Sequence, residues 1–224
     1  MKRMFIPALL AFATLGAPLH AATAITVEES VYEEPSGADR FIAEQFDVAP
    51  SRTPIASFGP FHMVSPTRAE LIGSIESDTP AQFRALLHAF PGLSQIDMVD
   101  CPGTDDDEAN FAVARMVRKA GIATYIPDGG SVRSGGVELF LAGAKRSAAP
   151  NAEFAVHSWV DEDGLEPDDY AADDPANREY VDYYREMGMT ADKAKAFYAL
   201  TNSVPHDDAL YLKTADIARY VTIN

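Results

Sequence analysis

Short apolar runs alternate with amphipathic segments along most of the chain after residue 54. The runs have the length and composition of buried strands, whereas the segments between them repeat apolar residues at helical spacing. Gly92 and Gly121 stand where the first two helical segments end. Strands that alternate with helices through short connections predict right-handed βαβ crossovers and a mostly parallel sheet. The predicted strands are 69–75, 96–101, 122–126 and 154–157, and the predicted helices are 80–90, 108–120 and 137–144.

The pattern changes at both ends of this alternating region. Residues 56–64 resemble an edge strand broken at Gly59-Pro60, and Thr79 is placed to cap the helix that Pro80 opens. Beyond residue 160 an acidic loop spans 161–174. We expect helices at 177–187 and 191–201, with Thr190 capping the second, and then a strand and a short helix within 209–220.

The N-terminus has the order of residues found in a secretory signal peptide. Lys2 and Arg3 precede an apolar run over 4–19, and small residues follow up to Ala24. Proline and glycine interrupt the run, which favours a cleaved signal over a membrane anchor. We therefore expect a signal peptide at 1–24, a flexible lead-in at 25–54, one domain at 55–224, and a periplasmic or secreted protein with no other membrane attachment.

The negative net charge of the chain argues against some classes of binding partner. The full chain has 18 basic and 34 acidic residues, and removal of Lys2 and Arg3 brings the net charge to about −18. Phosphate backbones and anionic lipid surfaces repel such a protein, which argues against nucleic-acid and membrane-surface roles. The single Cys101 excludes an internal disulfide, and it is either a buried apolar residue or a redox-sensitive thiol.

A serine and a histidine occupy the ends of neighbouring predicted elements. Ser134 opens the helix over 137–144, and His157 ends the last strand of the alternating region. Gly135 allows a substrate carbonyl to approach its N–H, and Thr104, in the turn after Cys101, offers a second N–H. Because ligands bind at one edge of open α/β sheets, these residues predict a nucleophile, a base and an oxyanion hole in one site.

Two blocks of sequence resemble a known family. Ser134-Gly-Gly-Val-Glu-Leu-Phe-Leu-Ala-Gly-Ala144 and Ala149-Pro-Asn-Ala-Glu-Phe-Ala-Val-His157 are similar to the serine and histidine blocks of the Clp protease proteolytic subunit, within the Clp/crotonase superfamily. The turn Cys101-Pro-Gly-Thr104 and the strand around Leu71 to Ile75 resemble earlier segments of that family. The resemblance implies an α/β fold with a βαβ spiral, a mostly parallel sheet and C-terminal helices.

The same resemblance implies a set of site residues and partners. Ser134 would be the nucleophile, His157 the general base, and the N–H groups of Gly135 and Thr104 the oxyanion donors. The family's third member is an aspartate near the chain end, for which Asp208 fits best and Asp207 is one residue away. The implied activity is that of a secreted serine hydrolase on a peptide or acyl substrate, without a cofactor, and homo-oligomers are compatible with it.

Several alternatives stay open or are disfavoured by the residues. Thr104 stands where the family has glycine, which leaves room for an inactive periplasmic binding or assembly module of the same fold. His206 is a rival base, whereas Lys145 lies too far along the Ser134 helix for a Ser/Lys dyad. The acidic loop lacks the full calcium-loop spacing. Acyl-CoA chemistry is disfavoured by export and by the acidic composition.

Overall fold

The computed structural model describes residues 49–224, all of which belong to the unit Pro35–Asn224. The predicted signal peptide and nearly all of the predicted lead-in lie outside these residues. The strands are β1 Ala56–Phe58, β2 Phe61–Ser65, β3 Arg68–Ile72, β4 Gln95–Cys101, β5 Ala123–Ile126, β6 Ser131–Arg133, β7 Arg146–Ala148, β8 Glu153–Val156 and β9 Leu210–Lys213. The helices are α2 Thr79–Ala89, α3 Asp107–Lys119, α4 Gly135–Leu141, α5 Pro175–Glu186, α6 Ala191–Thr201 and α7 Thr214–Ile217, with a short 3-10 helix at Pro167–Asp169.

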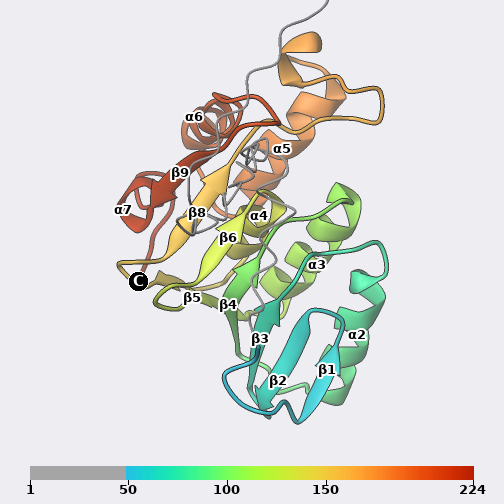
Figure 1. The fold of residues 1–224 in the computed structure, drawn as a ribbon. Coiled ribbons are helices and arrows are strands. Elements are labelled where there is room, and N and C mark those ends of the chain that lie inside the picture. Colours follow the sequence, from blue (N-terminus) through green and yellow to red (C-terminus); the bar gives the residue numbers. More distant parts are fainter. Residues whose placement is uncertain (1–48) are drawn as a thin grey trace, which may run out of the picture. The chain divides into compact units, whose positions relative to one another are not determined.

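The described strands form one mixed sheet in the order β1-β2-β3-β4-β6-β8-β9 (Figure 1). The inner neighbours β3, β4, β6 and β8 run parallel, while β1, β2 and β9 join antiparallel at the two edges. Strand β4 has two partners on one side, because its first residues pair with β5 and its last residues pair with β6. The sheet therefore divides at β4 into a β5 branch and a branch of β6 and β8. Ser134 follows β6 and His157 follows β8, so both residues lie on the second branch.

The sequence-based prediction of strands and helices is confirmed in outline and differs in detail. The Gly59-Pro60 break is the turn of a hairpin, in which Ala56 pairs with Met63 and Phe58 with Phe61. Strands β6 and β7 were not predicted, since each has only three residues between turn-forming segments. Short strands of this kind are defined by their neighbours in the sheet and leave no periodicity in the sequence.

The helix starts follow capping chemistry closely. Thr190 accepts a hydrogen bond from Lys193 N–H at the start of α6, as predicted. At α2 the cap position belongs to Asp78, and the Thr79 hydroxyl instead accepts from Glu76 N–H at 2.8 Å. Asp106 caps α3, and its carboxylate accepts from Ala109 N–H, so the helix starts just after the turn that contains Thr104.

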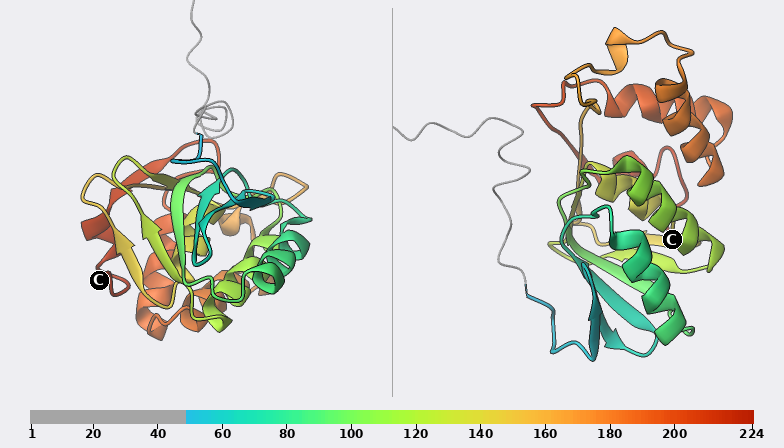
Figure 2. Two further views of the ribbon diagram at one scale, coloured as in Figure 1. Left: turned by 90° about the horizontal axis from the view of Figure 1, so that it is seen from below. Right: turned by 90° about the vertical axis from the view of Figure 1, so that its right-hand side faces the viewer.

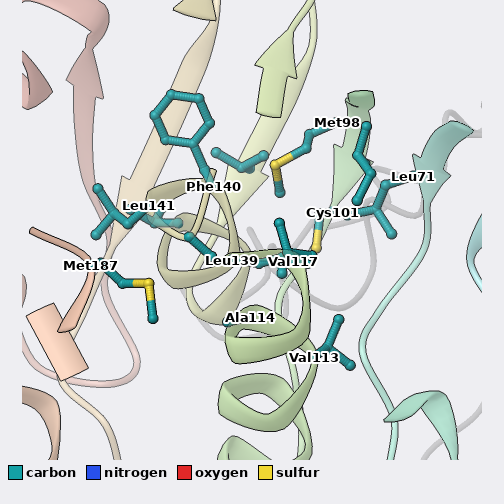
Figure 3. Packing of buried hydrophobic residues seen from close by; sticks show 14 of the residues in the cluster. Leu71, Met98, Cys101, Val113, Ala114, Val117, Leu139, Phe140, Leu141 and Met187 are labelled. Atoms are coloured by element: carbon teal, nitrogen blue, oxygen red, sulfur yellow. The ribbon is translucent and has the colours of Figure 1, made fainter. Parts of the chain in front are cut away.

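The core lies between the sheet and the helices that cover one of its faces. Figure 2 shows α2 and α3 side by side on that face, and Figure 3 shows apolar side chains of α3 and α4 meeting those of the strands. Val113, Val117, Phe140 and Leu141 are fully buried there. In residues 49–224 no helix has both the length and the apolar character needed to cross a bilayer. Burial of one helix face against a sheet is the arrangement that the apolar periodicity predicts.

Candidate active site

Ser134 lies at the sharp turn where β6 ends and α4 begins. Its backbone has φ 47° and ψ −130°, and it is the only residue other than glycine with a positive φ among residues 49–224. The Ser134 N–H donates to the carbonyl of Ala155 at 2.9 Å, which ties the turn to β8. Just before it, the buried Arg133 pairs with Asp100 of β4, with Nη1 and Oδ1 3.1 Å apart. Strong contacts on both sides thus hold the serine in a strained conformation.

The turn Cys101-Pro-Gly-Thr104 packs directly against this serine, as the sequence predicts. Gly103 has φ 136°, and a Cβ placed on it would lie 2.9 Å from the Ser134 Cβ. Glycine is therefore required at position 103 for two reasons: its positive φ, and the lack of space for a Cβ next to Ser134. Thr104 has no positive φ, so the residue that stands in place of the family's glycine needs no glycine backbone.

Gly135 and Thr104 are neighbours in space, although they come from different elements. A Cβ on Gly135 would lie 2.5 Å from Thr104 Cγ2 and 2.9 Å from Asn110 Nδ2. The buried Asn110 donates to the Gly135 carbonyl at 2.8 Å, and the Thr104 hydroxyl donates to the Ile75 carbonyl at 2.8 Å. Gly135 is the first residue of α4, so its N–H has no acceptor within the helix. The two backbone segments expected to hold an oxyanion are thus brought together, and the hydrogen bonds of Asn110 and of the Thr104 hydroxyl hold them in position.

His157 follows β8 and lies in the same pocket as Ser134. Its Nδ1 contacts the carbonyl oxygen of Ser158 at 2.8 Å. A carbonyl oxygen only accepts, so Nδ1 carries the hydrogen and a neutral imidazole has its lone pair on Nε2. Burial lowers the pKa of His157 below its ordinary 6.5, against the raising effect of the Ser158 carbonyl. The residue is thereby kept as a neutral base at neutral pH.

His206 is a second histidine in the pocket, and in the sequence only its proximity to Asp208 pointed to it. Its Nδ1 donates to the same Ser158 carbonyl at 3.0 Å, and its ring meets that of His157 edge to face at 4.7 Å between centroids. The N–H of His206 donates to Glu166 Oε1 at 3.0 Å. One carbonyl oxygen therefore orients two imidazoles.

The aspartates expected as the third member occupy a different place. Asp207 and Asp208 are both exposed, and neither lines the pocket that contains His157. The Asp208 carboxylate accepts from Ala209 N–H at 2.7 Å, at the entry to β9. The turn after Val204 directs His206, and not Asp208, toward His157. In this structure the Ser158 carbonyl holds the Nδ1 hydrogen that was predicted to bond to Asp208.

The pocket has a volume of about 260 Å³ and unites both halves of the site. One wall comes from the Thr104 turn, the start of α3 and the start of α4, and the other from residues after β8, including α5 and α6. Glu138 lines it one helical turn after Ser134 and is only 7% exposed. Burial raises its pKa to about 7, even though Tyr184 Oη donates to its Oε1 at 2.7 Å. The signal in the sequence is that Glu138 is the one polar residue of an otherwise apolar predicted helix.

Two other predicted features have structural roles. Cys101 is fully buried, and burial raises the pKa of its thiol to about 12, so it stays protonated and packs as an apolar residue. In the acidic loop, the Asp161 carboxylate accepts from the N–H groups of Asp163 and Leu165 at 2.9 and 2.8 Å. That carboxylate therefore organises the loop.

Comparison with known proteins places the fold. No family model and no curated protein matches the chain. A ClpP1 variant from Listeria monocytogenes matches with a TM-score of 0.50 and 16% identity over 71% of this chain and 92% of that one. The fold is Clp/crotonase-like. The membrane protease 1510-N from Pyrococcus horikoshii, specific for a stomatin homologue, matches with a TM-score of 0.46 and 19% identity over 70% of this chain and 71% of that one. The predicted fold class, with its parallel spiral and C-terminal helices, is confirmed.

Proposed function

We propose that this protein is a serine hydrolase that cleaves a peptide bond or another acyl bond. Ser134 Oγ attacks the substrate carbonyl and forms a C–O bond while its proton passes to His157 Nε2. The N–H groups of Gly135 and Thr104 stabilise the oxyanion, and the proton then passes to the leaving group as the acyl bond breaks. In the second step water, deprotonated by His157, releases the acyl group and restores Ser134.

The observation that carries the proposal is the strained backbone of Ser134 inside a pocket that also holds His157. A non-glycine residue with φ 47° costs about 1–3 kcal/mol and persists only where the surrounding structure enforces it. A serine on a sharp strand-to-helix turn presents its hydroxyl in front of the helix, next to the first N–H groups. The Ser158 carbonyl supports the role of His157 because it fixes the required tautomer without a carboxylate.

Covalent labelling tests the proposal directly. A fluorophosphonate probe should label the wild-type protein, and Ser134→Ala and His157→Ala should each abolish labelling. Ser203→Ala is the matched control, because Ser203 is exposed, lies outside the pocket, and donates its hydroxyl to the Leu200 carbonyl at the end of its own helix. Folded protein that resists labelling under all conditions would favour the inactive binding or assembly module.

The pH dependence of labelling tests the role of His157 separately. Because burial lowers its pKa below 6.5, the neutral form of the base predominates at pH 6.5 and above. The labelling rate should therefore be level at neutral pH and fall only as the pH drops through a value below 6.5. A rate that begins to fall above pH 7 would show that another group is the base.

A further inference from the structure

The charged groups around the Ser134 pocket have one sign. Asp105, Asp107 and Glu138 line it together with His157 and His206, and no lysine or arginine of residues 49–224 does so. Within residues 49–224 none of the three acids takes part in an ion pair. The pocket is therefore a region of negative potential in a strongly acidic protein.

Glu138 is the decisive residue, because it is buried deeply without a cation beside it. Its side chain contacts the hydroxyl of Tyr184, and its backbone carbonyl accepts from Tyr183 Oη at 2.5 Å. Buried carboxylates are normally paired with a cation or held neutral. Here burial raises the pKa to about 7, with a smaller contribution from Asp107, so the group is close to ionising at neutral pH. A ligand cation would supply the missing counter-charge.

Asp107 lies on the same wall as Glu138, and it meets aromatic rings that come from the other wall. Tyr180 Oη donates to Asp107 Oδ2 at 2.5 Å. Asp107 is an exposed residue, although desolvation of its carboxyl by the surrounding protein raises its pKa. The rings of Trp159 and Tyr180 stack with 4° between their planes, 6.2 Å apart. Aromatic faces beside carboxylates are a favourable surface for ammonium and guanidinium groups, which they attract through the π-system.

We propose that this pocket binds a cationic side chain, a lysine ammonium or an arginine guanidinium, on Glu138 and Asp107, next to the acyl bond presented to Ser134. Glu138 follows Ser134 by four residues, a rise of about 6 Å along the helix, which matches the reach of these side chains. This inference rests on the proposed function, because it names the substrate class of the proposed hydrolase. The binding itself requires no turnover.

Binding to a turnover-deficient protein tests the inference. The Ser134→Ala protein is titrated calorimetrically with Nα-acetyl-lysine amide and with its neutral isostere Nα-acetyl-norleucine amide, and then with the arginine and citrulline pair. We expect the cationic member to bind about tenfold more tightly in each pair. Adding Glu138→Gln should remove that preference, and Asp107→Asn should reduce it. Glu162→Gln, an exposed acid outside the pocket, should leave it unchanged.

Proton linkage gives a second readout from the same titrations. At pH 6 a bound cation should drive a proton off Glu138, so the heat of binding should differ between phosphate and Bis-Tris buffers, and Glu138→Gln should abolish the difference. Equal binding of both members, binding of neither, or a preference that survives Glu138→Gln overturns the inference. Fluorophosphonate labelling without cation preference refutes this inference alone, whereas cation preference without labelling refutes the hydrolase alone.

Discussion

Glu138 should make the stability of the protein depend on pH in a direction opposite to that of most carboxylates. Its pKa is about 7 in the folded state and 4.5 in the unfolded chain, so between these values the folded state binds more protons. Stability is then fully present below pH 4.5 and is lost as the pH rises through 7. The difference of about 2.5 pKa units corresponds to about 3 kcal/mol. Glu138→Gln keeps the shape and the Tyr184 hydrogen bond but has no proton to lose.

Urea unfolding at pH values from 4.5 to 8 measures this effect for the wild type and for Glu138→Gln. We expect the variant to gain stability over the wild type by about 3 kcal/mol between the two ends of the range. Glu162→Gln is the control, since an exposed glutamate should give a nearly constant difference. A difference between wild type and Glu138→Gln that does not change with pH would refute the reasoning that burial holds this carboxyl neutral.

Three further outcomes test the site and the chain end. The free energy of unfolding of Ser134→Gly should exceed that of Ser134→Ala by about 1 kcal/mol or more, because glycine adopts the positive φ without strain. Equal urea midpoints for the two variants would contradict the strain. Asn110→Ala should lower the free energy of unfolding by about 1–3 kcal/mol and slow fluorophosphonate labelling, because it removes the buried hydrogen bond that Asn110 donates to the Gly135 carbonyl. Wild-type labelling kinetics in this variant would show that Asn110 does not brace the oxyanion site. On export, mass spectrometry of the mature protein should find cleavage after Ala21 or Ala24; an intact N-terminus would contradict the signal peptide.

The sequence predicted the parts of the site that depend on local order along the chain. Ser134, the turn before Thr104 and the end of β8 each follow from a strand or helix boundary that periodicity and turn residues mark. Their meeting follows from the parallel connections, since the carboxyl ends of parallel strands share one edge of the sheet. The strain at Ser134 could not be predicted, because it arises from the β6 to β8 pairing and from Gly103 packed against the serine.

The second wall of the pocket depends on contacts that no local pattern encodes. Asp208 was expected beside His157 on resemblance alone, whereas the path of the turn after Val204 brings His206 there. The hydrogen bond from His157 to the Ser158 carbonyl is a backbone contact and leaves no trace in residue type. Glu138 was recognised as the exception on an apolar helix. Its burial against Tyr184 depends on the packing of α5 against α4, which is a tertiary contact that no local pattern encodes.

The antiparallel pairing of β8 with β9 has a consequence for how substrate range can change. Val156 pairs with Leu210, so the chain leaves the sheet and returns to it at adjacent points, and residues from the segment between them build one wall of the pocket. Substitutions at Trp159, Val160 or Asn202, which line the pocket and lie outside β8 and β9, can therefore reshape that wall while the strand register that positions Ser134 stays as it is. If Ser134 is the proposed nucleophile, its substrate range could in this way be altered through side chains of a single continuous segment.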